Sequence, residues 1–177
     1  IAAVAGLFHR PVPGKRGAID IDAVRTMIRP KIARNKMPTA LVTVETSHNS
    51  AGGAVMSVDY LTALGAVTHE HGVPFHIDGA RLFNAAVKLG VPAAAVAKPA
   101  DSVCFCISKG LSAPFGSLLC GSAEFIERAR AFRRMVGGGM RQAGVMAAAG
   151  LVAFDQMIDR LAEDHARAAQ LAAGIAR

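Results

Sequence analysis

Short β-branched runs alternate with segments of helical spacing along this chain, and the alternation restricts the folds open to it. Four runs have the length and composition of strands: 40–45 (ALVTVE), 73–78 (VPFHID), 102–107 (SVCFCI) and 117–120 (SLLC). Strand–helix–strand repeats build parallel sheets with helices packed on them. The sequence therefore predicts an α/β fold with a largely parallel sheet and flanking helices.

Helical segments are expected between and after these strands. Their predicted ranges are 19–28, 60–71, 82–89, 124–135, 140–154 and 159–177. Asp20 or Asp22 stands near the start of the first helix. Ser57 or Asp59 can cap the second, because these side chains accept hydrogen bonds from free N–H groups. Pro30 is expected to end the first helix, since the residue before a proline avoids the helical region.

Composition and charge narrow the range of partners. The 177 residues are 52% hydrophobic, which suits one globular domain with a packed core. The net charge is +7, but the Lys and Arg residues are spread along the chain without interleaved aromatics, so we expect no nucleic-acid partner. The longest apolar run, 145–154, is far shorter than the ~20 residues that cross a bilayer, and we expect no membrane partner.

The three cysteines, Cys104, Cys106 and Cys120, show no CxxC spacing, so the sequence predicts neither a disulfide framework nor a metal site. Cys104 and Cys106 stand within an apolar run and are interpreted as small buried hydrophobes. This use of cysteine favours a reducing, intracellular compartment. The chain opens with Ile1 and its last helix reaches Arg177 without a stop signal, so we expect one domain truncated at both ends.

The end of the strand at 73–78 carries the first candidate for chemistry. Strand alternation places His76 and Asp78 on the same face of the sheet. Asp78 stands at the carboxyl end of the strand, where open α/β sheets place ligand-binding groups. A carboxylate there, followed by Gly79, can hold a cationic ring nitrogen or a metal ion. The alternative is that Asp78 only caps the next helix.

The second candidate is Lys109, which follows the strand at 102–107 and opens a loop that contains Gly and Pro. Desolvation and nearby positive charge lower the proton affinity of a lysine, as a Schiff-base lysine requires. The alternative is an ordinary loop lysine.

Two further motifs are less specific. Glycines 137–139 are expected to lead into a helix, where free N–H groups attract an anion and Arg141 adds a charge. A flexible connection would have the same composition. His48, in the polar cluster 45–50, could be a base, a stacking group or a surface histidine.

Three segments resemble the low-specificity threonine aldolases, which belong to the fold-type I pyridoxal-phosphate enzymes. They are HIDGARLFNAAVKLGVP (76–92), SVCFCISKGLSAPFGSLLCG (102–121) and MVGGGMRQAGVMAAAGLVAF (135–154). The similarity runs from about Ala40 to Asp164. It implies that residues 1–155 form part of the cofactor-binding large domain and that 156–177 form a helix leading into a small domain.

The resemblance implies a role for each matching residue. Lys109 would carry pyridoxal phosphate, and Asp78 would pair with its ring nitrogen. Arg81 would bind the carboxylate of the substrate, and His48 would lie close to the substrate's side-chain hydroxyl. Arg141 would reach the cofactor phosphate of the same or a neighbouring subunit. Lys109, His48 and Asp78 would be the catalytic residues.

The function implied is cleavage of threonine or allo-threonine to glycine and acetaldehyde, by a cytoplasmic homo-oligomer (a dimer or tetramer). The alternatives are another pyridoxal-phosphate lyase, acting on a β-hydroxy or aromatic amino acid, and a non-catalytic fragment. Thr46-Ser47 replaces the usual Asn-Thr pair of the family. The resemblance implies that the family's phosphate-binding turn and ring-stacking histidine lie upstream of Ile1, and that a further carboxylate-binding arginine lies beyond Arg177.

Overall fold

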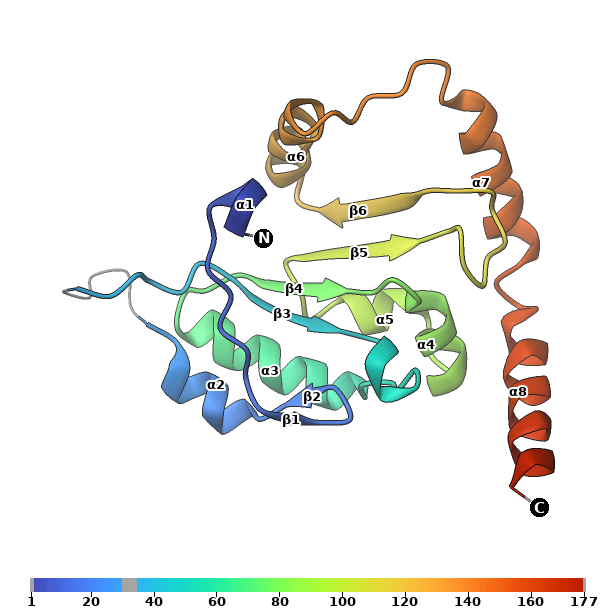
Figure 1. Ribbon diagram of the computed structural model, residues 1–177, viewed down its shortest axis with the longest axis horizontal. Helices are drawn as coiled ribbons and strands as arrows, with labels where there is room; N and C mark the ends of the chain where they lie inside the picture. Colours follow the sequence, from blue (N-terminus) through green and yellow to red (C-terminus); the bar gives the residue numbers. More distant parts are fainter. Residues whose placement is uncertain (1, 30–34, 177) are drawn as a thin grey trace.

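The computed structural model describes residues 2–29 and 35–176, and its centre is a four-stranded sheet (Figure 1). The strands are β3 (Val42–Glu45), β4 (Phe75–Asp78), β5 (Ser102–Cys106) and β6 (Ser117–Gly121), in the order β3-β4-β5-β6. The first three are parallel and β6 is antiparallel to β5. The predicted α/β fold with a largely parallel sheet is confirmed.

The remaining elements surround this sheet. The helices are α1 (Ala2–Ala5), α2 (Ile21–Met27), α3 (Val58–Glu70), α4 (Leu82–Leu89), α5 (Ala93–Ala97), α6 (Ala123–Met135), α7 (Gly144–Gln156) and α8 (Leu161–Ile175), with a 3₁₀ turn η1 (Asn49–Ala51). A small hairpin joins β1 (Gly14–Lys15) to β2 (Ala18–Ile19). The short elements α1, η1, α5 and the hairpin were not predicted from the sequence. Within the described ranges, no helix is long and apolar enough to cross a membrane.

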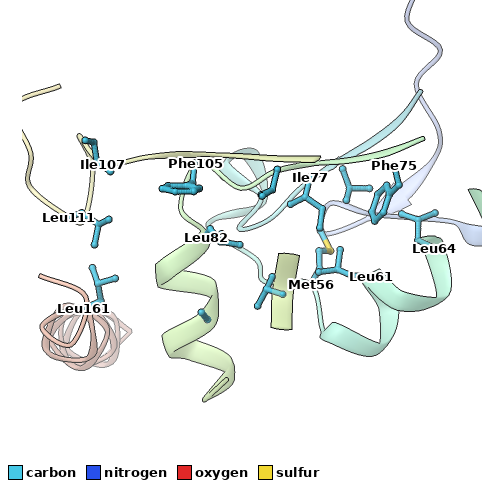
Figure 2. Close-up of a cluster of buried hydrophobic side chains, with 14 of the residues drawn as sticks. Met56, Leu61, Leu64, Phe75, Ile77, Leu82, Phe105, Ile107, Leu111 and Leu161 are labelled. Atoms are coloured by element: carbon cyan, nitrogen blue, oxygen red, sulfur yellow. The ribbon is translucent and has the colours of Figure 1, made fainter. Parts of the chain in front are cut away.

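The hydrophobic core lies between the sheet and the layer of helices α3, α4 and α5 (Figure 2). Phe75 and Ile77 of β4 have no exposed surface, and Leu61 and Leu64 of α3 are equally buried below them. Side chains alternate along a strand, so burying Phe75 and Ile77 turns the residues between and after them to the opposite face. Leu161, at the start of α8, extends the same core.

Capping side chains decide where α2 and α3 begin. Asp20 accepts hydrogen bonds from the backbone N–H groups of Asp22 and Ala23, which makes Asp20 and not Asp22 the cap of α2. Ser57 accepts from the Tyr60 N–H and caps α3. Helix α2 ends at Met27; the prediction that Pro30 ends it concerns a residue outside the described ranges.

Strand β6 is the most exposed strand of the sheet. It stands last in the strand order, and all five of its residues are exposed, Leu118 and Leu119 among them. Helix α6, which follows it, has an apolar side with Phe125 and Phe132, and these side chains are also exposed. The amphipathic pattern therefore predicted the helix correctly, but the described residues leave its apolar side uncovered.

At the amino end of the parallel strands, Asp101 ties β5 to β4 and α3. Its carboxylate oxygen Oδ2 accepts from the backbone N–H of Phe75 at 2.7 Å and lies 2.9 Å from Nε2 of His69. Partial burial raises the pKa of Asp101, but the bond from Phe75 and the bond and charge of His69 together lower it below its usual value.

We expect Asp101→Asn to lower the free energy of unfolding of the full-length protein by about 1 kcal/mol at pH 7, a modest value because the carboxylate is half exposed. A carboxyl group with a lowered pKa stabilises the fold above the unfolded-state pKa, here about 3.8, and this contribution is lost as the pH falls through the folded-state value. Urea unfolding at pH 7 and pH 3 measures the effect. The difference between wild type and variant should shrink at pH 3; an equal difference at both values would contradict the assignment.

Candidate functional site

Three adjacent parallel strands bring their following segments to one edge of the sheet (Figure 1). Glu45 of β3 is paired with Asp78 of β4, and Asp78 is paired with Cys104 of β5. His48 follows β3 by three residues, and Lys109 follows the end of β5 by three. The topology therefore gathers His48, Asp78 and Lys109 at the carboxyl edge, where α/β sheets bind their ligands.

Asp78 is the last residue of β4 and its side chain is exposed, on the face opposite the core. Its Oδ1 accepts from the backbone N–H of Ala80 at 3.1 Å and from the Cys104 thiol at 3.7 Å. Helix α4 begins at Leu82 with Arg81 in the cap position and without a side-chain capping bond. The interpretation of Asp78 as a helix cap is therefore wrong. In the part of the chain that the structure describes, Oδ2 has no hydrogen-bond partner and can accept from a bound cationic N–H.

His76 shares the face of Asp78, as the alternation predicted. Its Nδ1 lies 2.8 Å from the Ser102 hydroxyl. Burial lowers the pKa of His76, although the carboxylate of Asp78 opposes the shift. His76 is thus neutral near pH 7 and does not compete as a cation for the Asp78 carboxylate.

The cysteines of β5 lie differently from the prediction. Cys104 and Cys106 are partly exposed on the face that carries Asp78, so their interpretation as buried hydrophobes is wrong. Burial raises the pKa of the Cys104 thiol, and the charge of Asp78 raises it further. The thiol therefore remains protonated and donates to Asp78. The alternation used for β4 would have predicted this neighbour if it had been applied to β5.

Lys109 lies in a tight turn that follows β5. Its carbonyl accepts from the Ser112 N–H at 2.9 Å, and Ile107 accepts from the Ala113 N–H at 3.0 Å. Ile107 and Leu111 are buried in the core, whereas the Lys109 side chain is exposed (Figure 2 shows the two anchors). The turn therefore anchors the backbone on both sides of the exposed Lys109, in the loop after β5 where the sequence predicted it.

Arg81 and His48 complete this edge of the sheet. Arg81 is half buried, three residues after Asp78, and its carbonyl begins the hydrogen bonding of α4. His48 follows β3, and its Nε2 lies 3.9 Å from Oε2 of Glu45. Glu45 was not predicted as a site residue, because its approach to His48 depends on how the chain turns after β3.

Arg141 is not brought to the same edge. It is exposed on the connection between α6 and α7, which arches away from the sheet (Figure 1). Helix α7 begins at Gly144, later than predicted. Gly137 and Gly138 belong instead to the end of α6, because their N–H groups donate to the carbonyls of Arg134 and Arg133. The prediction that these two glycines offer free N–H groups to an anion at the start of a helix is therefore wrong.

Two side chains at the carboxyl edge of the sheet suit two groups of pyridoxal phosphate. A carboxylate with a free oxygen, on Asp78, matches a protonated ring nitrogen, and the exposed amine of Lys109 matches an aldehyde carbon. Asp78 ends β4 and Lys109 follows the adjacent strand β5, so both residues lie at the same edge of the sheet. Arg81, a half-buried residue, adds a guanidinium whose planar fork matches a carboxylate.

Sequence comparison places these residues in a known context. A family model described as beta-eliminating lyase matches residues 1–177. The chain is 44% identical over 177 residues to low-specificity L-threonine aldolase 1 of Arabidopsis thaliana, covering 99% of this chain and 49% of that protein. It is 42% identical over 176 residues to the low specificity L-threonine aldolase of Escherichia coli K12, covering 97% and 51%. The chain thus spans about half the length of the curated relatives it matches.

Structural comparison agrees with the sequence. A threonine aldolase from Leishmania major superposes with a TM-score of 0.77 at 19% identity, over 93% of this chain and 48% of that one, which supports the fold alone. The resemblance to threonine aldolases and the fold-type I architecture predicted from it are confirmed.

A substitution at Gly110, the residue after Lys109, tests whether packing against α4 and α8 holds the turn that follows β5. A Cβ on Gly110 would lie 2.8 Å from Cδ2 of Leu161 and 3.0 Å from Oδ1 of Asn84. We expect Gly110→Ala to destabilise the full-length protein by about 1–3 kcal/mol, because the turn must shift away from α4 and α8. Gly174→Ala is the control: it meets open space within a helix and should stabilise slightly. Equal unfolding free energies for Gly110→Ala and wild type would show that this packing does not hold the turn.

Proposed function

Since the chain belongs to the beta-eliminating lyase family, we propose that the full-length protein is a pyridoxal-phosphate-dependent aldehyde-lyase that cleaves threonine or allo-threonine to glycine and acetaldehyde. The observation that carries the proposal is the position of Asp78 and Lys109 at one edge of the sheet: Asp78 ends β4, and Lys109 follows the adjacent parallel strand β5. The identity of 42–44% to proteins named L-threonine aldolase supports the choice of substrate.

Three residues would hold the cofactor. Asp78 would accept the ring N–H through Oδ2, while the Cys104 thiol occupies Oδ1. Lys109 would carry the cofactor through its amine, and Arg141 would bind the phosphate of the cofactor in a neighbouring subunit. The bound group would supply an electron-withdrawing ring that stabilises negative charge at Cα.

The substrate would be bound and oriented by Arg81 and His48. The Arg81 guanidinium would bind the amino-acid carboxylate with two parallel hydrogen bonds, a geometry that fixes the substrate in position. His48 would contact the side-chain hydroxyl. Cleavage breaks the Cα–Cβ bond as a base takes the proton of the hydroxyl, which yields acetaldehyde; Cα then gains a proton and the product is glycine.

The wider setting is also part of the proposal. Residues 1–155 would form part of the large domain, and 156–177 the helix that leads into a small domain. A cytoplasmic homo-oligomer, dimeric or tetrameric, would bring Arg141 to a partner's site. Apolar side chains that are exposed on α6, such as Phe132 and Met135, support such an assembly.

Lys109→Ala tests the attachment of the cofactor. Borohydride reduction of the full-length protein with pyridoxal phosphate should leave a pyridoxyl group on the peptide that contains Lys109, and the variant should lose both this label and turnover. Lys98→Ala is the control, because Lys98 ends α5 at the other edge of the sheet. A labelled, active Lys109→Ala protein would disprove the assignment, and mass spectrometry of the digest decides.

Arg81→Lys tests the substrate contact. Lysine keeps the charge but lacks the planar fork, so the KM for threonine should rise by about tenfold or more while the affinity for pyridoxal phosphate stays unchanged. Steady-state kinetics and a cofactor titration on the same variant measure the two effects. If KM is unchanged and cofactor affinity falls, Arg81 serves the cofactor and not the carboxylate.

A further inference from the structure

The turn of the β1–β2 hairpin lies directly against His48. Lys15 pairs with Ala18, and the two turn residues between them, Arg16 and Gly17, have positive φ angles of 52° and 85°, as in the tight turns that suit hairpins. A Cβ on Gly17 would lie 2.3 Å from Cγ of His48 and 2.6 Å from Cδ2. Glycine therefore allows a contact between backbone and imidazole that any side chain would prevent.

The hairpin is fixed to the helices beneath the sheet. The Tyr60 hydroxyl of α3 donates to the carbonyl of Ile19 at 2.8 Å. The N–H of Asp20 donates to the carbonyl of Pro13 at 3.0 Å, and the Asp20 side chain caps α2. These hydrogen bonds hold the hairpin turn in place against His48.

On its other side, His48 is held through its backbone. Its N–H donates to the Ala54 carbonyl at 2.7 Å, and its own carbonyl accepts from the Gly53 N–H at 2.9 Å. The backbone of His48 is therefore fixed, and the hairpin contact fixes the ring that it carries.

The two ring nitrogens of His48 have different surroundings. Within the described residues Nδ1 is buried without a hydrogen-bond partner, whereas Nε2 lies 3.9 Å from Oε2 of Glu45. A proton on Nδ1 would be a buried donor without an acceptor, which is costly. A proton on Nε2 would lie near a carboxylate, which attracts it.

We propose that the β1–β2 turn positions His48. The backbone of Gly17 packs against the imidazole and orients it, so that Nε2–H can donate a hydrogen bond to a bound molecule. The inference rests on the proposed function in one respect, that the bound molecule is the hydroxyl-bearing amino acid. Gly17 is a positioning residue, because it acts through His48.

Nuclear magnetic resonance of the full-length protein with ¹⁵N-labelled histidine tests the positioning without reference to activity. Two-bond ¹H–¹⁵N spectra report which ring nitrogen carries the proton, and His48→Ala identifies the signals. Gly17→Ala is compared with Gly72→Ala, because Gly72 has a φ of 64° but open space around an added Cβ. Both variants strain the backbone, and only the first pushes on His48.

Wild type and Gly72→Ala should show His48 in the Nε2-protonated form, and Gly17→Ala should show a mixture of tautomers. Unchanged His48 signals in Gly17→Ala would overturn the proposal. So would an Nδ1-protonated ring in wild type, a result that is available even if Gly17→Ala does not fold.

Kinetics provide the second measurement. We expect kcat for threonine to fall about ten- to hundredfold in Gly17→Ala, to stay near wild type in Gly72→Ala, and to fall no further when Gly17→Ala is added to His48→Ala. A further fall in the double variant would show that Gly17 acts independently of His48, against the proposal. If the protein cleaves no threonine but the spectra behave as expected, the positioning stands and the proposed function fails.

Discussion

The burial of Phe75 and Ile77 against α3 is the interaction on which the arrangement of the site depends. These two side chains lock the central strand β4 onto the helix layer. A slip of one residue would exchange the two faces of β4, and Asp78 would then point into the core. Because β3 and β5 pair with β4 in parallel, its register also sets where His48 and Lys109 leave the sheet. Packing on one face thus determines the chemistry on the other.

Periodicity made much of this predictable. A period of two in β4 indicated that His76 and Asp78 share one face of the sheet, and the alternation of strands with helices indicated parallel pairing. Helix ends were predicted well where a capping side chain marks them, as at Ser57, which accepts from the Tyr60 N–H at the start of α3. Such signals are local, so the sequence carries them without knowledge of the fold.

Features that arise from contacts between distant segments could not be predicted in this way. The β1–β2 hairpin has strands of two residues each, too short for any periodic signal. Gly17 and His48 are 31 positions apart along the printed sequence, and only the fold reveals their contact. The start of α7 was misplaced because a glycine triplet can equally end one helix or precede the next.

The exposed strand β6 has a consequence for handling this stretch of chain by itself. Among the described residues β6 has a strand neighbour on one side only, so its outer N–H and C=O groups form a template for another strand. Leu118 and Leu119 would add apolar burial to such pairing. A preparation limited to residues 1–177 would therefore tend to associate edge to edge through β6 as its concentration rises.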